Sequence, residues 1–237
     1  MADADYVYVG SELETFKLAR NWKSYWASVL APHVRGAVLE VGAGAGANIP
    51  YLLNPRVTRF LGLEPDGRLF ATMARETSSA GPPAVGARQG MMADLPPGER
   101  FDTIVYLDVL EHIEQDRQEV ADAASLLNPG GRLVVLAPAF QQLYSEFDRA
   151  VGHYRRYTTA TLTALAPPTL TLDAARYLDA FGACLSGANR LLLSKSMPSE
   201  ANILLWDRWI VPLSRVADHV LQRVVGRSVV CVWERQP

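Results

Sequence analysis

Residues 38–52 read VLEVGAGAGANIPYL, and this stretch decides the fold. An apolar run ends at Val41, and three glycines (Gly42, Gly44 and Gly46) follow before a second apolar stretch. Glycines let the backbone turn tightly and approach a ligand closely, and a helix behind them offers free N–H groups and the positive end of its dipole. The stretch therefore predicts a strand, a ligand-binding turn and a helix.

Short apolar runs alternate with helical patterns around this stretch. Five strands are predicted at 37–41, 59–64, 84–88, 102–107 and 132–137, with helices at about 46–54, 66–78 and 115–127. Two more strands are expected, within 169–178 and at 228–233. This rhythm predicts an α/β fold: a doubly wound, seven-stranded sheet with helices on both faces and a helical insertion before the last strand.

The 237 residues are expected to form one domain. Its parts are an N-terminal helical lid (1–35), a cofactor-binding core (36–138), a substrate loop with a helical cover (139–227) and the last strand (228–237). Ser11 and Glu14 form a capping-box pattern for the first helix. Pro212 predicts a kink or break in the amphipathic C-terminal helical segment. Its apolar stripe is expected to pack on the domain; a homodimer contact is the second interpretation and a position on a membrane surface the third.

Composition narrows the function. The net charge of -2 gives no general basic field, so a small-molecule acceptor is favoured and no nucleic acid is expected. Cys184 and Cys231 lack metal-ligand spacing, so we expect reduced thiols and no metal site. An acidic N-terminus and the lack of an 18-residue apolar run predict a cytoplasmic protein without a transmembrane segment.

The glycine pattern alone fits two cofactors. Gly42-x-Gly44-x-x-Ala47, with Glu64 about 20 residues on, also matches the fingerprint of an NAD(P)-dependent oxidoreductase. Glu40, two residues before the first glycine, separates the two, because its carboxylate would repel a diphosphate and suits the ammonium group of a methionine moiety.

Residues 38–48 resemble the glycine motif of class I S-adenosylmethionine-dependent methyltransferases, of the type 11/12-like, small-molecule subgroup. Four later stretches are similar to that family in the same order: LGLEPD (61–66), GMMADLP (90–96), FDTIVYLDVLEHI (101–113) and LNPGGRLVVLAP (127–138). The resemblance implies a Rossmann-like sheet whose last strand is antiparallel, with S-adenosyl-L-methionine as the cofactor.

The resemblance also implies roles for single residues. Glu64 resembles the acid that holds both ribose hydroxyls, and Asp94 the acid that accepts from the adenine amino group. The expected cofactor-binding residues are Glu40, Gly42, Ala43, Gly44, Gly46, Asn48, Glu64, Pro65, Asp94, Leu95, Leu107 and Asp108.

Candidate catalytic residues are Asp108 and His112, in the region that borders the transferred methyl group in the resembling family, and His153 as a base. Helix capping and packing is the alternative for Glu111 and His112. The long loop after the fifth strand carries GHYRRY (152–157), and loops of this length are commonly functional.

We expect this loop and the first helix to bind an acceptor, including an anionic one. The expected substrate-binding residues are Tyr154, Arg155, Arg156, Tyr157 and Tyr25. The alternative is a surface loop in which the arginines pair with Glu146 or Asp148.

The sequence therefore predicts a methyltransferase acting on the oxygen, nitrogen or carbon of a small molecule, in settings such as natural-product or cell-envelope metabolism. Three alternatives stay open: the NAD(P)-dependent oxidoreductase, a non-catalytic cofactor-binding protein, and an enzyme that uses the same cofactor for non-methylating chemistry.

Overall fold

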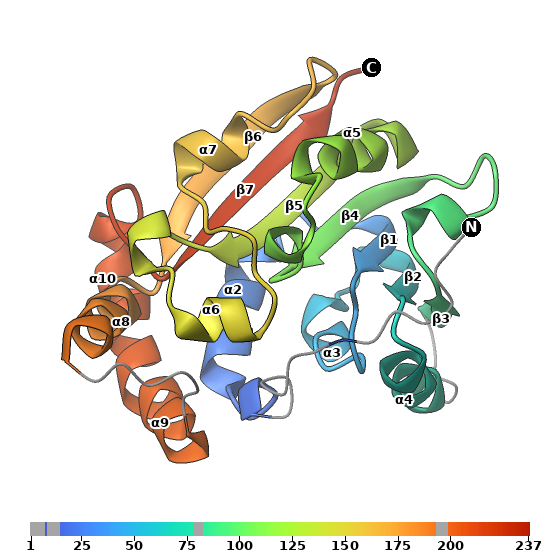
Figure 1. Ribbon diagram of the computed structural model, residues 1–237. Coiled ribbons are helices and arrows are strands. Elements are labelled where there is room, and N and C mark those ends of the chain that lie inside the picture. Colours follow the sequence, from blue (N-terminus) through green and yellow to red (C-terminus); the bar gives the residue numbers. More distant parts are fainter. Residues whose placement is uncertain (1–7, 9–14, 78–82, 193–198) are drawn as a thin grey trace.

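The computed structural model describes residues 8, 15–77, 83–192 and 199–237, and a seven-stranded sheet runs through them (Figure 1). The order is β3-β2-β1-β4-β5-β7-β6, and β7 is antiparallel to both of its neighbours. The strands are β1 (Gly36–Val41), β2 (Val57–Glu64), β3 (Ala84–Gln89), β4 (Phe101–Leu107), β5 (Leu127–Pro138), β6 (Leu170–Leu178) and β7 (Ser228–Arg235). The predicted doubly wound sheet with an antiparallel last strand is confirmed.

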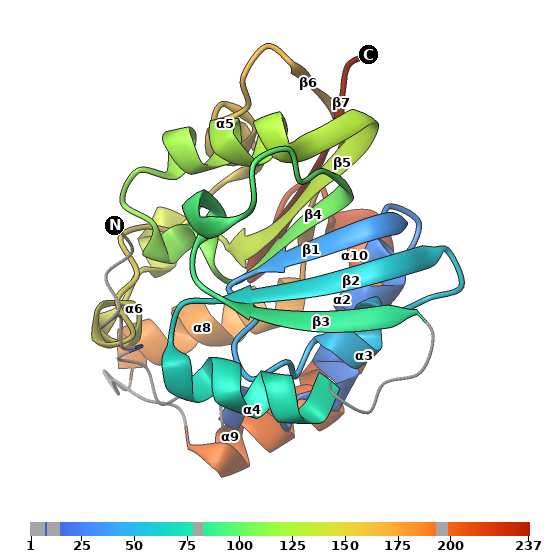
Figure 2. The same cartoon turned by 90° about the vertical axis from the view of Figure 1, so that its right-hand side faces the viewer.

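Helices cover both faces of this sheet, as predicted. In Figure 2, α5 lies above the sheet, and α4, α8 and α9 lie below it. The α-helices are α2 (Arg20–Leu30), α3 (Ile49–Leu52), α4 (Gly67–Thr77), α5 (Asp116–Leu126), α6 (Glu146–Ala150), α7 (Thr159–Thr163), α8 (Ala180–Leu192), α9 (Glu200–Leu205) and α10 (Val211–Leu221). Short 3-10 turns are η1 (Met92–Asp94), η2 (Leu110–His112) and η3 (Gln141–Leu143), and η4 (Trp206–Ile210) is a π-helical turn.

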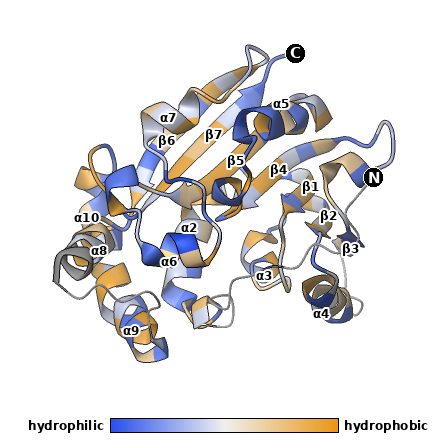
Figure 3. Cartoon of the chain, in the orientation of Figure 1, coloured by the Kyte–Doolittle hydropathy of each residue, from blue (hydrophilic) through white to orange (hydrophobic). Residues whose placement is uncertain are grey.

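The central strands bury both of their faces. Along β4, Ile104 and Tyr106 join the core under α5, while Val105 and Leu107 join the core shared with α2. Parallel strands buried on both sides appear in sequence as continuous apolar runs, which is why the pattern located them. Figure 3 shows these strands in hydrophobic colours, whereas α6 is mostly hydrophilic.

The structure differs from the sequence prediction at two turns. The helix expected at 46–54 is limited to α3, because Gly46 has φ +84° and the chain turns as far as Asn48. The predicted helix at 115–127 and strand at 132–137 leave a turn between them, but Leu127 is already extended and pairs with Phe101, so β5 follows α5 directly. The capping box at Ser11 and Glu14 lies outside the described residues.

The insertion between β6 and β7 contains α8, α9 and α10, as predicted. Pro212 lies in the first turn of α10, directly after η4, so the expected irregularity is present. The outer side of this segment exposes Trp209, Leu213 and Val220. Among the described residues, no helix has the length and apolar character needed to cross a membrane.

Candidate functional site

A cavity of about 540 Å³ lies where β1, β2, β4 and β5 end, since Val41, Glu64, Leu107 and Pro138 all line it. The strand order reverses between β1 and β4, and open α/β sheets bind ligands in the crevice at such a point. Small-molecule sites commonly measure roughly 300–1,000 Å³. The cavity is therefore in the expected place and of a suitable size for a cofactor and an acceptor.

The glycine loop forms one wall. Gly42 has φ +65°, and a Cβ there would lie 2.8 Å from both methyl groups of Val109, so only glycine fits. Gly44 has φ +58° with nothing within 4 Å of a Cβ, and it lines the cavity together with Ala43. Gly46 is not among the lining residues, because it packs on Met73.

Glu64 closes the end of β2. Its Oε2 accepts from the Gly44 N–H at 2.7 Å, and its Oε1 accepts from the Asp66 N–H at 2.9 Å. Burial raises the pKa of Glu64, and these two hydrogen bonds oppose the shift. A carboxylate has about four acceptor positions. Glu64 therefore keeps the capacity to accept from two neighbouring hydroxyls, with Pro65 beside it on the wall.

Glu40 lies beneath the cavity wall rather than in it. Its Oε1 accepts from the Asn48 side chain at 3.2 Å, and its Oε2 has no hydrogen-bond partner among the described residues. Burial raises the pKa of Glu40 to about 8, although Asn48 and Lys23 act in the opposite direction. An ammonium group arriving here would favour the ionised carboxylate.

Lys23 is a site residue that the sequence prediction missed. Its Nζ donates to the Asn48 side chain at 2.6 Å, and both residues line the cavity. Lys23 follows the buried Ala19 by four residues and precedes the buried Trp26 by three, so it lies on the inner face of α2. This helical spacing from apolar residues is the feature of the sequence that could have identified Lys23. Trp26 also lines the cavity, in keeping with the expected position of the first helix.

Asp108 opens the other half of the cavity. It has φ +54°, an uncommon backbone conformation for a residue other than glycine and one that is frequent at functional sites. Its side chain faces the cavity and is exposed to it, and the nearby protein still desolvates the carboxyl enough to raise its pKa, while His153 and Arg227 act in the opposite direction. Leu107, directly before it, also lines the cavity.

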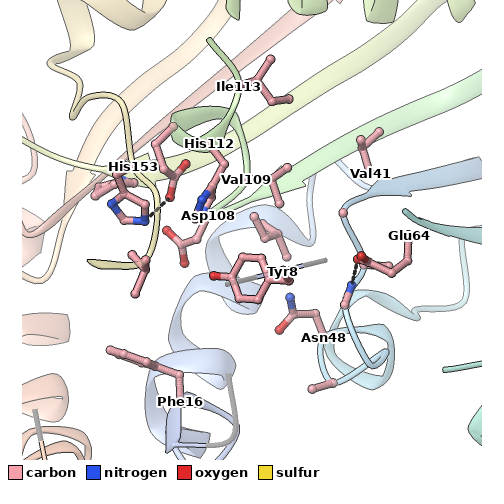
Figure 4. Close-up of a pocket in the computed structure, with 18 of the residues that line it drawn as sticks. Tyr8, Phe16, Val41, Asn48, Glu64, Asp108, Val109, His112, Ile113 and His153 are labelled. Atoms are coloured by element: carbon pink, nitrogen blue, oxygen red, sulfur yellow. Dashed lines mark hydrogen bonds and ion pairs between the residues drawn. The ribbon is translucent and has the colours of Figure 1, made fainter. Parts of the chain in front are cut away.

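Glu111, His112 and His153 come together beside Asp108. Figure 4 shows Asp108, His112 and His153 grouped on the side of the cavity away from Asn48 and Glu64. The rings of His112 and His153 meet edge to face, with centroids 4.5 Å apart, and His153 Nε2 is 3.8 Å from Glu111 Oε1. Burial and the nearby His153 lower the pKa of His112 to about 4, whereas burial and Asp108 raise that of Glu111.

The loop between β5 and α7 is held by a buried carboxylate. Asp148 accepts from the Arg156 guanidinium at 2.7 and 2.9 Å and lies 2.9 Å from His153 Nδ1. The alternative that an arginine of this loop pairs with Asp148 is therefore observed, but Asp148 is fully buried rather than on the surface. Arg156 and His153 both line the cavity.

The other residues of the GHYRRY segment lie outside the cavity wall. Arg155 pairs with Asp116, and the Tyr157 hydroxyl donates to the same carboxylate at 2.9 Å. Tyr154 is 52% exposed. These contacts anchor the loop to the start of α5, so the placement of these three residues does not support the expected substrate contacts.

Tyr25, Asp94 and Leu95 are also not brought to the cavity wall. The Tyr25 hydroxyl donates to Asp218 of α10 at 2.7 Å, so it faces the helical insertion instead. Asp94 accepts from the Met91 N–H at 2.9 Å and closes η1, while Leu95 packs in the core. Met91 itself lines the cavity.

Comparisons with known proteins agree with this geometry. The family model described as "Methyltransferase domain" matches residues 39–133, which include the glycine loop, Glu64 and η2. A protein of Mycolicibacterium smegmatis named "Probable S-adenosylmethionine-dependent methyltransferase" is 35% identical over 131 residues, 54% of this chain and 49% of that protein. A tRNA U34 carboxymethyltransferase of Syntrophotalea carbinolica is 32% identical over 121 residues, 48% of this chain and 37% of that protein.

The chain thus spans less than half the length of these curated relatives. Among solved structures, N-methyltransferase NodS of Bradyrhizobium japonicum in complex with S-adenosyl-L-homocysteine aligns with a TM-score of 0.58 at 17% identity, over 94% of this chain and 88% of NodS. A chain from the Haloferax volcanii complex of the Trm112 methyltransferase activator with a methyltransferase aligns with a TM-score of 0.65 at 15% identity, over 100% of this chain and 99% of that one. At such low identity these two structures support the fold alone.

Proposed function

Because the chain belongs to the class I S-adenosylmethionine-dependent methyltransferase family, we propose that it transfers the methyl group of S-adenosyl-L-methionine to a small-molecule acceptor. One observation carries the proposal. A single cavity joins the glycine loop and Glu64 to Asp108, His112 and His153, so a cofactor and an acceptor have adjoining places.

The cofactor half fits a sulfonium nucleoside. Glu64 retains acceptor capacity for the two ribose hydroxyls, and open space beside Gly44 lets the ligand approach the backbone. The Oε2 of the buried Glu40, which has no hydrogen-bond partner within the described part of the chain, lies below Asn48 and suits the cationic amino-acid end. A diphosphate offers this carboxyl no positive charge to pair with, which disfavours the oxidoreductase.

The bound cofactor would supply a methyl group on a positively charged sulfur. The chain's own contribution is to hold the acceptor in line with that group and to exclude water. Asp108 and His153 border the place for the acceptor, and either can take a proton from an acceptor hydroxyl or ammonium group. Phe147 and Val151, from the loop after β5, give this half an apolar side.

A small acceptor is favoured over RNA, although some relatives carry names of tRNA-modifying enzymes. The chain has a net charge of -2, whereas RNA-binding surfaces are strongly basic. Acidic side chains, Asp108 and Glu111, lie on the acceptor side.

Calorimetric titration with S-adenosyl-L-methionine, S-adenosyl-L-homocysteine and NADH tests the cofactor. We expect both sulfur nucleosides to bind and NADH not to bind. Glu64→Gln removes one charged acceptor oxygen, so affinity should fall by about 10- to 100-fold, since hydrogen bonds to charged groups contribute roughly 1.5–3 kcal/mol. Glu76→Gln, on the exposed side of α4, is the matched control and should bind like the wild type.

The reaction is then tested by mass spectrometry. The protein is incubated with S-adenosyl-L-methionine and pools of small phenols, amines and carboxylic acids, or with a tRNA transcript, and release of S-adenosyl-L-homocysteine is measured. Release with a small molecule is the expected result. NADH binding without sulfur-nucleoside binding would exclude the proposal, and turnover with tRNA alone would replace the small-molecule acceptor.

A further inference from the structure

We propose that Glu111, His112 and His153 form a binding site for one divalent transition-metal ion, with Zn²⁺ as the probe ion, on the acceptor side of the cavity. Each residue offers one ligand atom, and the three atoms lie within 4.8 Å of one another. With metal–ligand bonds of roughly 2.0–2.2 Å, donors in a tetrahedral zinc site are about 3.4 Å apart. The side chains therefore need to close by little more than an ångström. This site reverses the sequence-based expectation that no metal is bound.

Glu111 is the strongest part of the case. It is 0% exposed, and neither of its carboxyl oxygens has a hydrogen-bond partner among the described residues. Burying a carboxyl group without partners is costly, and nearly all buried polar groups in proteins have one. A structural role would give this group donors from its surroundings. A cation held by Glu111 supplies the missing partner.

His153 directs its second ring nitrogen toward Glu111. Its Nδ1 is 2.9 Å from Asp148, which also accepts two hydrogen bonds from Arg156 and therefore acts as an acceptor. In the neutral imidazole, Nδ1 therefore carries the proton and the lone pair is on Nε2, 3.8 Å from Glu111 Oε1. A histidine oriented by a carboxylate in this way is the usual arrangement behind a metal ligand.

The donor set indicates the kind of ion. Two imidazole nitrogens and one carboxylate oxygen are typical of catalytic zinc and non-haem iron sites, in which three protein ligands leave at least one position open. Mg²⁺ prefers oxygen ligands and should bind much more weakly. His112 and His153 both line the cavity, so the open position faces the place for the acceptor.

The role of the ion rests on the proposed function, although its binding does not. In a methyltransferase, the ion would hold an oxygen atom of the acceptor, a hydroxyl or a carboxylate, beside the cofactor. It would also lower the pKa of a bound hydroxyl, so that a neutral alcohol or phenol becomes a better nucleophile. With His153 engaged as a ligand, Asp108 would take the proton that the hydroxyl loses.

The test uses the full chain without a histidine tag, stripped with a chelator and dialysed. Titration calorimetry with ZnCl₂ and with MgCl₂ measures affinity, and elemental analysis of the dialysed complex measures stoichiometry. We expect one Zn²⁺ per chain, bound at least about 100-fold more tightly than Mg²⁺. Glu111→Gln keeps the shape of the side chain and should lose more affinity than the roughly 10- to 100-fold typical of second-shell changes.

Three controls make the result decisive. Thermal unfolding of metal-free Glu111→Gln should give a Tm no lower than that of the wild type, because a buried carboxyl that has no hydrogen-bond partner among the described residues is replaced by a group that cannot ionise. If Glu111→Gln fails to fold, His112→Ala provides a second test, because it should also lose affinity for Zn²⁺. His219→Ala removes an exposed histidine of α10 and should leave Zn²⁺ binding unchanged.

Wild-type protein without stoichiometric Zn²⁺, or Glu111→Gln that binds Zn²⁺ as tightly as the wild type, would overturn the site. A loss of Zn²⁺ affinity in His219→Ala as large as that in Glu111→Gln would also overturn the site, since the metal would then bind at the surface. S-adenosyl-L-homocysteine is titrated into the same samples. Nucleoside binding without Zn²⁺ binding removes this inference alone, and Zn²⁺ binding without nucleoside binding removes the proposed function instead.

Discussion

Asp148→Asn should destabilise the protein strongly, because this carboxylate neutralises a buried arginine. Asp148 is 0% exposed and accepts two hydrogen bonds from Arg156, two from Ser145 and one from His153. Asparagine keeps the volume but removes the charge, and its amide N–H groups would face guanidinium donors. Breaking a buried ion pair by removing one partner costs roughly 3–5 kcal/mol.

Urea denaturation at pH 7, followed by tryptophan fluorescence, measures this loss on metal-free protein. For a chain of this size, each kcal/mol of lost unfolding free energy lowers Tm by roughly 2–4 °C, so thermal unfolding should show a fall of about 6–20 °C. Glu146→Gln is the matched control, because Glu146 pairs with Arg149 in the same short helix but both side chains are about two-thirds exposed. Its effect should stay within about 0.5 kcal/mol.

A double variant tests the cause. In Asp148→Asn/Arg156→Met no buried cation is left without its partner, so the loss should be no larger than that of Asp148→Asn alone. A loss below about 1 kcal/mol for Asp148→Asn, or strictly additive losses in the double variant, would refute the buried ion pair as the anchor of this loop.

Gly42→Ala and the control Gly98→Ala both place a side chain at positive φ, but only at Gly42 would the new Cβ lie 2.8 Å from other atoms. Gly42→Ala should therefore lower the free energy of unfolding, measured by urea denaturation, by about 1–3 kcal/mol more than Gly98→Ala. Equal losses in the two variants would contradict the close approach. Burial raises the pKa of Asp66, but backbone and arginine hydrogen bonds outweigh it and bring the pKa to about 2, so Asp66 stabilises the protein fully above about pH 4 and loses this effect as the pH falls toward 2. The stability difference between wild type and Asp66→Asn should therefore shrink between pH 4 and pH 2, and a difference that is constant across this range would count against the shift. Tyr25→Phe should lower the free energy of unfolding by about 1–2 kcal/mol, because Asp218 loses a buried donor, and leave the KM for the acceptor unchanged; a changed KM at full stability would restore Tyr25 as a substrate-binding residue.

The strands could be predicted because burial on both faces leaves a direct mark on the sequence. The apolar runs before Gly42 and Asp108 are β1 and β4 in the structure, displaced by a single residue at their first position. Turns were harder. The predicted helix at 115–127 and strand at 132–137 leave a break at 128–131, but β5 already begins at Leu127 and pairs irregularly with β4.

The site was predictable only where the chemistry is local. The glycine loop and Glu64 are close in the chain, and the structure brings them together through the Gly44 N–H. The partner of Tyr25 is 193 residues away, and no spacing in a single sequence reveals such a contact. That Glu111 has no hydrogen-bond partner among the residues the structure describes likewise follows from three-dimensional packing, although its neighbour His112 was predicted as a catalytic residue.

The left-handed backbone at Asp108 restricts which residues evolution can place there. Glycine, asparagine and aspartate adopt this conformation at low cost, whereas β-branched side chains do not. Homologous chains that keep the same bend after the fourth strand should therefore draw this position from those three residue types. The residue at this position can therefore be used to separate distant homologues that share this active-site geometry from those that share only the sheet.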